Sequence, residues 1–226
     1  MDFSGRYFPK HLILQVVRWY LRYGLSYRDL EEILEERGVE LAHTTPYRWV
    51  QTYAPQLEAE HRKRRAVCGT SWRMDETYIK IKGEWVYLYR AVDTEGNTVD
   101  FLLTKHRDTK AARRFLNKAI RLNGQPGKVT IDKSGANTAA LNELNADLEK
   151  QNKPPVQIRQ NKYLNNLIEQ DHRGVKRRTR SMLGFHSFRT ARNTLKGIEL
   201  CHMMRKGQYD KTEAANDWEY FYSLAG

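Results

Sequence analysis

The chain has 226 residues, of which 40% are hydrophobic and 11% are aromatic. This is enough apolar side chain for a folded core, so the composition excludes a disordered protein. The formal net charge of +12 favours a polyanionic partner such as nucleic acid. No stretch approaches the roughly 18 apolar residues of a membrane span, and the first residues lack the apolar segment of a signal peptide. We therefore expect a cytoplasmic protein without a membrane partner.

The positive charge is concentrated in the last third of the chain. Residues 1–66 carry 11 Lys and Arg against 9 Asp and Glu, a net of +2. Residues 159–206 carry 12 Lys and Arg against 3 Asp and Glu, a net of +9. The two cysteines, Cys68 and Cys201, are far apart and form no zinc-binding or disulfide pattern. We interpret both as ordinary thiols.

The first 65 residues contain the patterns of three helices. Apolar residues recur at helical spacing from His11 to Tyr23, and Gly24 ends that segment. Ser26 is a candidate N-cap for a second helix, with Asp29 three residues further on. The sequence therefore predicts two short amphipathic helices before residue 38.

A third helix is expected to open at residues 43–50. Thr44 and Thr45 are its candidate N-caps. Pro55 and the charged stretch 58–65 are interpreted as the exit from this unit, either as a solvated helix or as a linker. We place a domain boundary near Arg65.

The hydrophobic period then changes from helical to two, which is typical of strands. The β-rich runs cover residues 72–81, 85–92 and 98–104. Hairpin signals separate them at residues 82–84 and 93–97. Three consecutive antiparallel strands are predicted.

The rest of the chain alternates helices with short strands. Periodicity alone establishes a mixed α/β fold, and the order of the elements resembles that of an RNase H-like domain. The expected elements are a helix from Asp108 or Thr109 to Leu122, a strand at 129–131, a helix at 136–150, a strand at 156–159, and helices from about Asn165 and about Ser187.

Three carboxylates are candidates for a catalytic site. Asp75 lies within a predicted strand among apolar neighbours, where a carboxylate is costly unless it is paired or bound to a metal. Its neighbour Glu76 must face the other side of the strand. Asp132 follows a strand at the end where α/β sheets bind ligands, and Glu169 precedes the most basic segment. Oxygen ligands that converge in this way favour Mg²⁺ or Mn²⁺ over zinc.

Several motifs occur in an order that resembles the bacterial insertion-sequence transposases of the insertion sequence six family. The motifs are W-x-M-D-E-T-Y with the following W-x-Y-L-Y-R-A-V-D, T-I-D-K, N-N-x-I-E-x-D-H-x-x-x-K, L-G-F and K-G-I-E. The likeness runs from about Arg6 to Lys206. Several motifs in one order are more specific than any one of them.

The resemblance implies a set of roles for this chain. Asp75, Asp132 and Glu169 take the places of the DDE triad, which would hold two metal ions, and Lys176 takes the place of the associated basic residue. The implied activity is metal-dependent DNA cleavage and strand transfer by replicative, cointegrate-type transposition. The implied partners are double-stranded DNA, as terminal inverted repeats and target DNA, and a second copy of the chain in a homodimer or higher homo-oligomer.

The resulting domain plan has three parts. Residues 1–65 are interpreted as a helix-turn-helix DNA-binding domain, residues 66–206 as an RNase H-like DDE catalytic domain, and residues 207–226 as a C-terminal tail. Trp49 is expected to pack in the core rather than to contact bases. The candidate DNA-contacting residues are Thr44, Thr45, Tyr47, Arg48, Arg177, Arg178 and Arg180.

Two alternative functions remain open at this stage. One is a DNA-binding regulator whose α/β domain is catalytically inactive. The other is an RNase H-type nuclease that acts on RNA–DNA hybrids. For Asp171 and His172, which share the Glu169 motif, structural support of the site is favoured over direct chemistry.

Overall fold

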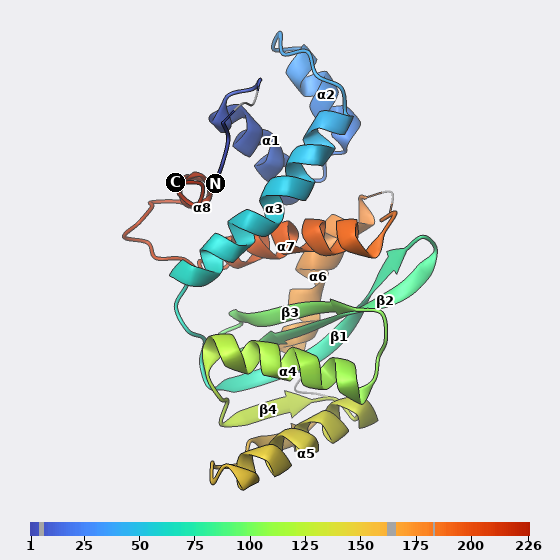
Figure 1. The fold of residues 1–226 in the computed structure, drawn as a ribbon, viewed down its shortest axis with the longest axis vertical. Coiled ribbons are helices and arrows are strands. Elements are labelled where there is room, and N and C mark those ends of the chain that lie inside the picture. The colour runs from blue at the N-terminus through green and yellow to red at the C-terminus, as the bar shows by residue number, and fades with distance from the viewer. Residues whose placement is uncertain (5–6, 162–165, 183) are drawn as a thin grey trace. The chain divides into compact units, whose positions relative to one another are not determined.

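The fold is described by a computed structural model and consists of two compact units (Figure 1). One unit contains residues 1–66 together with 174–226, and the other contains residues 67–173. The described residues are 1–4, 7–161, 166–182 and 184–226. Asn165, at the expected start of a helix, and Leu183 of the L-G-F motif lie outside them.

The unit of residues 67–173 is built on a five-stranded mixed sheet in the order β3-β2-β1-β4-β5. β1 to β3 are antiparallel, whereas β4 runs parallel to both β1 and β5. The predicted strands are confirmed to within one residue at each end, and the mixed α/β class is confirmed with them. The strands are β1 (Ser71–Ile81), β2 (Glu84–Val92), β3 (Thr98–Thr104), β4 (Lys128–Ile131) and β5 (Gln157–Gln160).

Two helices of this unit begin after residues whose side chains cap them, as the sequence predicts for the first of the two. Asp108 accepts a hydrogen bond from the backbone of Ala111 and starts α4 (Thr109–Asn123). Ser134 caps α5 (Gly135–Lys150) in the same way. α4 lies over the sheet in Figure 1 and contacts β3. Their apolar faces and the sheet enclose a core that includes Trp72, Tyr89, Phe115, Leu116 and Leu141.

Among the described residues, five helices lie wholly within the other unit. α3 is packed against both α1 and α7, and α8 contacts α1. The predicted capping box of Ser26 and Asp29 is present at the start of α2. The helices are α1 (Lys10–Arg22), α2 (Tyr27–Glu35), α3 (Thr44–Arg64), α7 (Phe188–Arg205) and α8 (Asp217–Ser223).

The third helix differs from its prediction at its start. It begins at Thr44 after His43, so neither Thr44 nor Thr45 is its N-cap. It continues through Pro55 to Arg64, so the charged stretch is helical, which is one of the two alternatives expected for it. Proline cannot donate a hydrogen bond to the carbonyl of Gln51, and the side chain of Asn193 on α7 donates to that carbonyl at 3.4 Å instead. The tertiary partner therefore explains why the helix persists.

The expected domain plan also changes at its C-terminal side. The predicted break near Arg65 lies one residue from the observed one, but the chain rejoins the first unit at Gly174 rather than remaining in one domain to residue 206. Residues 207–226 are not a separate tail. Tyr220 of α8 shares a hydrogen bond of 3.2 Å with the buried His61, and Asp217 pairs with Arg18 at 3.2 Å. The packing of α7 and α8 on α1 and α3 joins the two ends of the chain in one unit.

The remaining helix is α6 (Asn166–Arg180). Its residues up to Arg173 belong to one unit, and those from Gly174 on belong to the other. It continues through Gly174, where a Cβ atom would overlap the imidazole of His202 on α7. The absence of a side chain at Gly174 therefore leaves room for the His202 ring of the neighbouring helix. No helix among the described residues is long and apolar enough to cross a membrane.

Candidate active site

The three predicted carboxylates lie on neighbouring elements of the unit of residues 67–173. Asp75 is in the middle of β1, and its side chain is 18% exposed. Asp132 directly follows β4, the parallel neighbour of β1, and accepts a hydrogen bond of 3.0 Å from the backbone of Ser134. Glu169 is exposed in the first turn of α6. The parallel pairing of β1 and β4 places the two aspartates on adjacent strands.

Electrostatic coupling links these carboxylates. Burial, together with the negative charges of Glu76, Asp132 and Glu169, raises the pKa of Asp75 to about 7. Both Asp132 and Glu169 are therefore close enough to disfavour the charged form of Asp75. The site concentrates negative charge around a partly buried carboxylate.

The chemistry of this donor set fits a hard divalent cation. Carboxylate oxygens are the ligands that Mg²⁺ and Mn²⁺ prefer, and the negative charges of Asp132 and Glu169 act on Asp75. Over the ranges that the structure describes, no three His, Cys, Asp or Glu side chains already stand close enough together to hold a metal ion. The three carboxylates are brought near one another without forming a closed set of ligands.

Glu76 faces away from Asp75, as the alternation of side chains along a strand predicts. Its buried carboxylate forms an ion pair with Arg107 and accepts a hydrogen bond of 3.0 Å from Asn137 on α5. The Nη2 atom of Arg107 also lies 4.0 Å from Oδ2 of Asp132. Arg107 thus joins the strand of Asp75 to the loop of Asp132. Sequence reasoning missed this residue, because an arginine after a strand carries no distinctive signal.

Asp171 and His172 connect α6 to the sheet. The buried guanidinium of Arg90 pairs with Asp171 at 2.6 Å, and Arg90 lies directly opposite Asp75 in the pairing of β1 with β2. The Nδ1 atom of His172 lies 3.8 Å from Oδ2 of Asp75. These contacts favour structural support of the site for Asp171, and they place His172 beside Asp75.

The predicted DNA-contacting residues of the basic segment differ in their exposure. Arg177 and Arg180 are exposed on α6, and Lys176 is half-buried. Arg178 is only 7% exposed. Its guanidinium donates hydrogen bonds to the carbonyl oxygens of Tyr20 and Leu25 and to the Ser181 hydroxyl. Arg178 therefore differs from the other predicted DNA contacts, because its guanidinium is bound by groups of the protein itself.

The candidates at the start of α3 are accessible. Thr44, Tyr47 and Arg48 are exposed, and Thr45 is half-buried. Trp49 is buried and contacts the ring of Phe8 edge to face, as expected for core packing. The exposed side chains occupy the first turns of the helix.

Comparisons with known proteins agree with these features. A family model described as a DDE domain matches residues 69–208. The transposase for the insertion sequence-like element IS431mec of Staphylococcus aureus strain N315 is 47% identical over 205 residues, which are 90% of this chain and 88% of that protein. The S. aureus transposase for insertion sequence element IS257 in transposon Tn4003 matches with the same identity and coverage. Each match extends over most of both chains.

Solved structures with similar arrangements come from retroviral integrases. The HTLV-2 integrase catalytic core domain in complex with magnesium is 19% identical, covers 50% of this chain and 72% of that chain, and gives a TM-score of 0.40. The catalytic core domain of BIV integrase is 15% identical, covers 58% of this chain and 83% of that chain, and gives a TM-score of 0.44.

The family match defines the class of protein. A mixed α/β unit that matches the DDE domain and carries Asp75, Asp132 and Glu169 identifies a metal-dependent polynucleotidyl transferase. Its identity to insertion-sequence transposases extends over nearly the whole chain. The chain belongs to the transposases of the insertion sequence six family.

Removing the anchor of α6 is expected to destabilise the protein. In Asp171→Asn the buried Arg90 loses its charged partner, and the free energy of unfolding should fall by about 3–5 kcal/mol. Asp147→Asn weakens a half-exposed pair with Arg113 and should cost less, about 1 kcal/mol. Urea unfolding of both variants measures the difference. Equal losses would mean that the Arg90 pair does not anchor the helix.

The raised pKa of Asp75 predicts a pH-dependent stability. Because the folded pKa of about 7 exceeds the ordinary value of 3.8, this group stabilises the metal-free protein fully below pH 3.8 and loses that contribution as the pH rises through about 7. The loss is on the order of a few kcal/mol. Mg²⁺ should restore stability above pH 7, where the carboxylate is charged.

Urea unfolding across this pH range, with EDTA or with Mg²⁺, measures both effects. Asp75→Asn is the control, since it lacks the titrating group. It should lose the part of the pH slope that Asp75 contributes and most of the gain from Mg²⁺. Identical slopes in the variant and the parent protein would contradict the assignment of this pKa to Asp75.

Proposed function

We propose that the protein binds the terminal inverted repeats of an insertion sequence and cuts and joins DNA strands at Asp75, Asp132 and Glu169. The observation that supports this proposal is the electrostatic effect of Asp132 and Glu169 on Asp75. It indicates that three carboxylates from distant parts of the sequence lie close together. In this proposal residues 67–173 form an RNase H-like catalytic core. The outcome is replicative, cointegrate-type transposition, as in the family that the sequence resembles.

The residues of the site have different proposed roles in strand cleavage and transfer. Asp75 and Asp132 would hold the metal ions from adjacent strands, and Glu169 would complete the set from α6. Two bound Mg²⁺ or Mn²⁺ ions would supply positive charge at the scissile phosphate and activate the attacking oxygen. Arg90 and Asp171 fix the helix that carries Glu169, while Arg107 neutralises the buried carboxylate of Glu76. Such a site needs no covalent link between protein and DNA.

The helices α1 to α3 are proposed to form a helix-turn-helix reader. Thr44, Tyr47 and Arg48 are exposed in the first turns of α3, where a recognition helix contacts base edges. Thr45 lies beside them. Cutting two paired ends implies at least a homodimer. The packing of α7 on α3 indicates that residues 1–65 need the C-terminal helices to present this reader.

Lys176 is proposed to hold the DNA backbone near the metal site. It lies in α6, seven residues after Glu169, and its ammonium would act as a point charge on a phosphate. Arg177 and Arg180 are exposed on the same helix and would add attraction that depends less on position.

Removing a metal ligand is expected to separate chemistry from binding. Asp75→Asn and Asp132→Asn should each reduce cleavage and joining at least about a hundredfold, because every carboxylate of the site is required, while binding of end DNA persists. Glu143→Gln, an exposed position on α5, is the control and should act like the parent protein. The substrate is the DNA that flanks the coding region, assayed with and without Mg²⁺.

The same assay decides between the proposal and its two alternatives. Absence of metal-dependent nicking by the parent protein would indicate an inactive DNA-binding regulator. Preference for an RNA–DNA hybrid over the end duplex would indicate a hybrid nuclease. Activity near that of the parent in either Asp variant would overturn the assignment of the site.

Lys176→Ala should reduce strand transfer strongly and make it more sensitive to salt, with a mild loss of end binding. Arg180→Ala should mainly weaken general DNA affinity, since an exposed arginine attracts the DNA backbone without a fixed position. Both variants are measured for binding and joining across a salt series. Equal and small effects would mean that this basic segment is only a solvated helix surface.

A further inference from the structure

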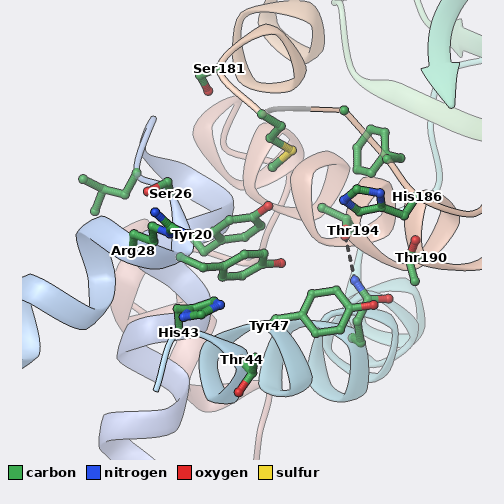
Figure 2. Close-up of a pocket in the computed structure, with 16 residues that line it drawn as sticks. Tyr20, Ser26, Arg28, His43, Thr44, Tyr47, Ser181, His186, Thr190 and Thr194 are labelled. Carbon is green, nitrogen blue, oxygen red and sulfur yellow. Dashed lines mark hydrogen bonds between the residues drawn. The ribbon is translucent and has the colours of Figure 1, made fainter. Parts of the chain in front are cut away.

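A cavity of about 460 Å³ lies within the unit of residues 1–66 and 174–226. Three tyrosines form its aromatic wall (Figure 2). The rings of Tyr20 and Tyr27 are stacked with centroids 4.0 Å apart, and Tyr47 meets Tyr27 edge to face at 5.7 Å. The volume is within the range of pockets that hold small organic groups.

Polar groups also line this cavity. His186, Thr190 and Thr194 come from α7 and the segment before it, and Ser26 and Thr44 contribute hydroxyl groups from the helix starts. Such groups can donate or accept hydrogen bonds at the edge of a planar ligand.

Gln51 adds an unused hydrogen-bonding atom to this wall. Its Nε2 atom donates to Thr194 at 2.9 Å, the contact dashed in Figure 2. Its Oε1 atom is buried and has no partner among the described residues. An acceptor in this position is costly unless a ligand or water satisfies it.

A second cavity of about 290 Å³ adjoins the first and supplies positive charge. The two share Tyr47, Gln51 and Thr190, and the second adds Arg48 from α3 and Arg189 from α7. None of the described residues that line either cavity is acidic. An aromatic cavity therefore opens beside two arginines with no carboxylate to neutralise them, which is the charge pattern that suits a nucleotide.

We propose that these two cavities bind one unpaired nucleotide of DNA, with its base in the tyrosine-lined cavity and its phosphate between Arg48 and Arg189. Aromatic side chains stack on any base, and arginines hold phosphates by paired hydrogen bonds. The site would take a nucleotide that has left the duplex, in addition to the duplex contacts of the reader. This inference rests on the proposed function, since it takes DNA as the ligand.

The tyrosine wall suits this ligand electrostatically. Burial raises the pKa of Tyr20 and of Tyr27 above the ordinary value of 10.0. A tyrosine hydroxyl is already protonated near neutral pH, and these shifts extend that range, so neither hydroxyl carries a negative charge that would repel a phosphate.

The test uses the full-length protein and fluorescently labelled DNA. One probe is a blunt duplex from the DNA flanking the coding region, and the other is the same duplex with a single unpaired nucleotide. The unpaired nucleotide carries 5-iodouracil, which crosslinks to aromatic rings that stack on it. We expect roughly tenfold or tighter binding of the second probe, as one base stacked on an aromatic ring contributes. The crosslink should map to Tyr27 or Tyr47.

Variants then assign the preference to the cavities. Tyr47→Ala should remove the preference for the unpaired nucleotide and Tyr47→Phe should keep it, because the ring is retained. Tyr23→Ala changes an exposed tyrosine of the same unit that lines neither cavity, and it should behave like the parent protein. Arg189 is exposed, so Arg189→Gln should fold normally and reduce the preference independently of the tyrosines.

Equal affinity of the parent protein for the two probes would overturn the proposal. A preference that survives both Tyr47→Ala and Arg189→Gln would overturn it as well. Failure of the proposed function has a different signature, namely no metal-dependent cleavage of the flanking DNA while the preference for the unpaired nucleotide remains.

Discussion

The ion pair between Arg90 and Asp171 determines how the candidate site is assembled. Arg90 is fully buried on β2, opposite Asp75, and its partner lies two residues beyond Glu169 on α6. A buried guanidinium without a carboxylate would be costly, so α6 must present Asp171 at this point of the sheet. That constraint brings His172 beside Asp75 and the charge of Glu169 within reach of it. The position of Glu169 therefore depends on the ion pair that Asp171 forms two residues further along the helix.

A second constraint comes from the return of the chain to its first unit. α7 covers α3 and compensates for the hydrogen bond that Pro55 cannot make, while α8 reaches the buried His61. Arg178 contributes by donating hydrogen bonds to two backbone carbonyl groups, that of Tyr20 in the last turn of α1 and that of Leu25 shortly after the helix. The C-terminal segment is thus part of the scaffold that holds α3 in place. Some of the basic residues of this segment, such as Arg178, therefore serve the fold. Others, such as Arg177 and Arg180, are exposed.

Local patterns were enough to predict most of the secondary structure. The period-two runs and hairpin turns gave β1 to β3, and the caps Ser26 and Asp108 gave the starts of α2 and α4, because these signals act over a few residues. Asp75 and Asp132 were visible for the same reason, as carboxylates within or after a strand. The family resemblance linked them to Glu169 and Lys176.

Long-range contacts were not accessible from the sequence. Nothing local distinguishes the buried Arg178 from the exposed Arg177, and nothing near Pro55 shows that Asn193 will stand beside the helix. The same holds for Arg107, whose importance comes from Glu76 and Asp132. These residues are defined by partners from distant parts of the chain, so only the three-dimensional arrangement reveals them.

The interleaving of the two units has a consequence for synthesis on the ribosome. Residues 67–173 are translated without interruption, so the unit with the three carboxylates can fold as soon as it emerges. Residues 1–66 emerge earlier, yet their core lacks α7 and α8 until translation has passed residue 223. The first helices to be made are therefore among the last to acquire their native packing. A nascent chain passes through a stage in which the catalytic core is formed and the unit proposed to read DNA is still open.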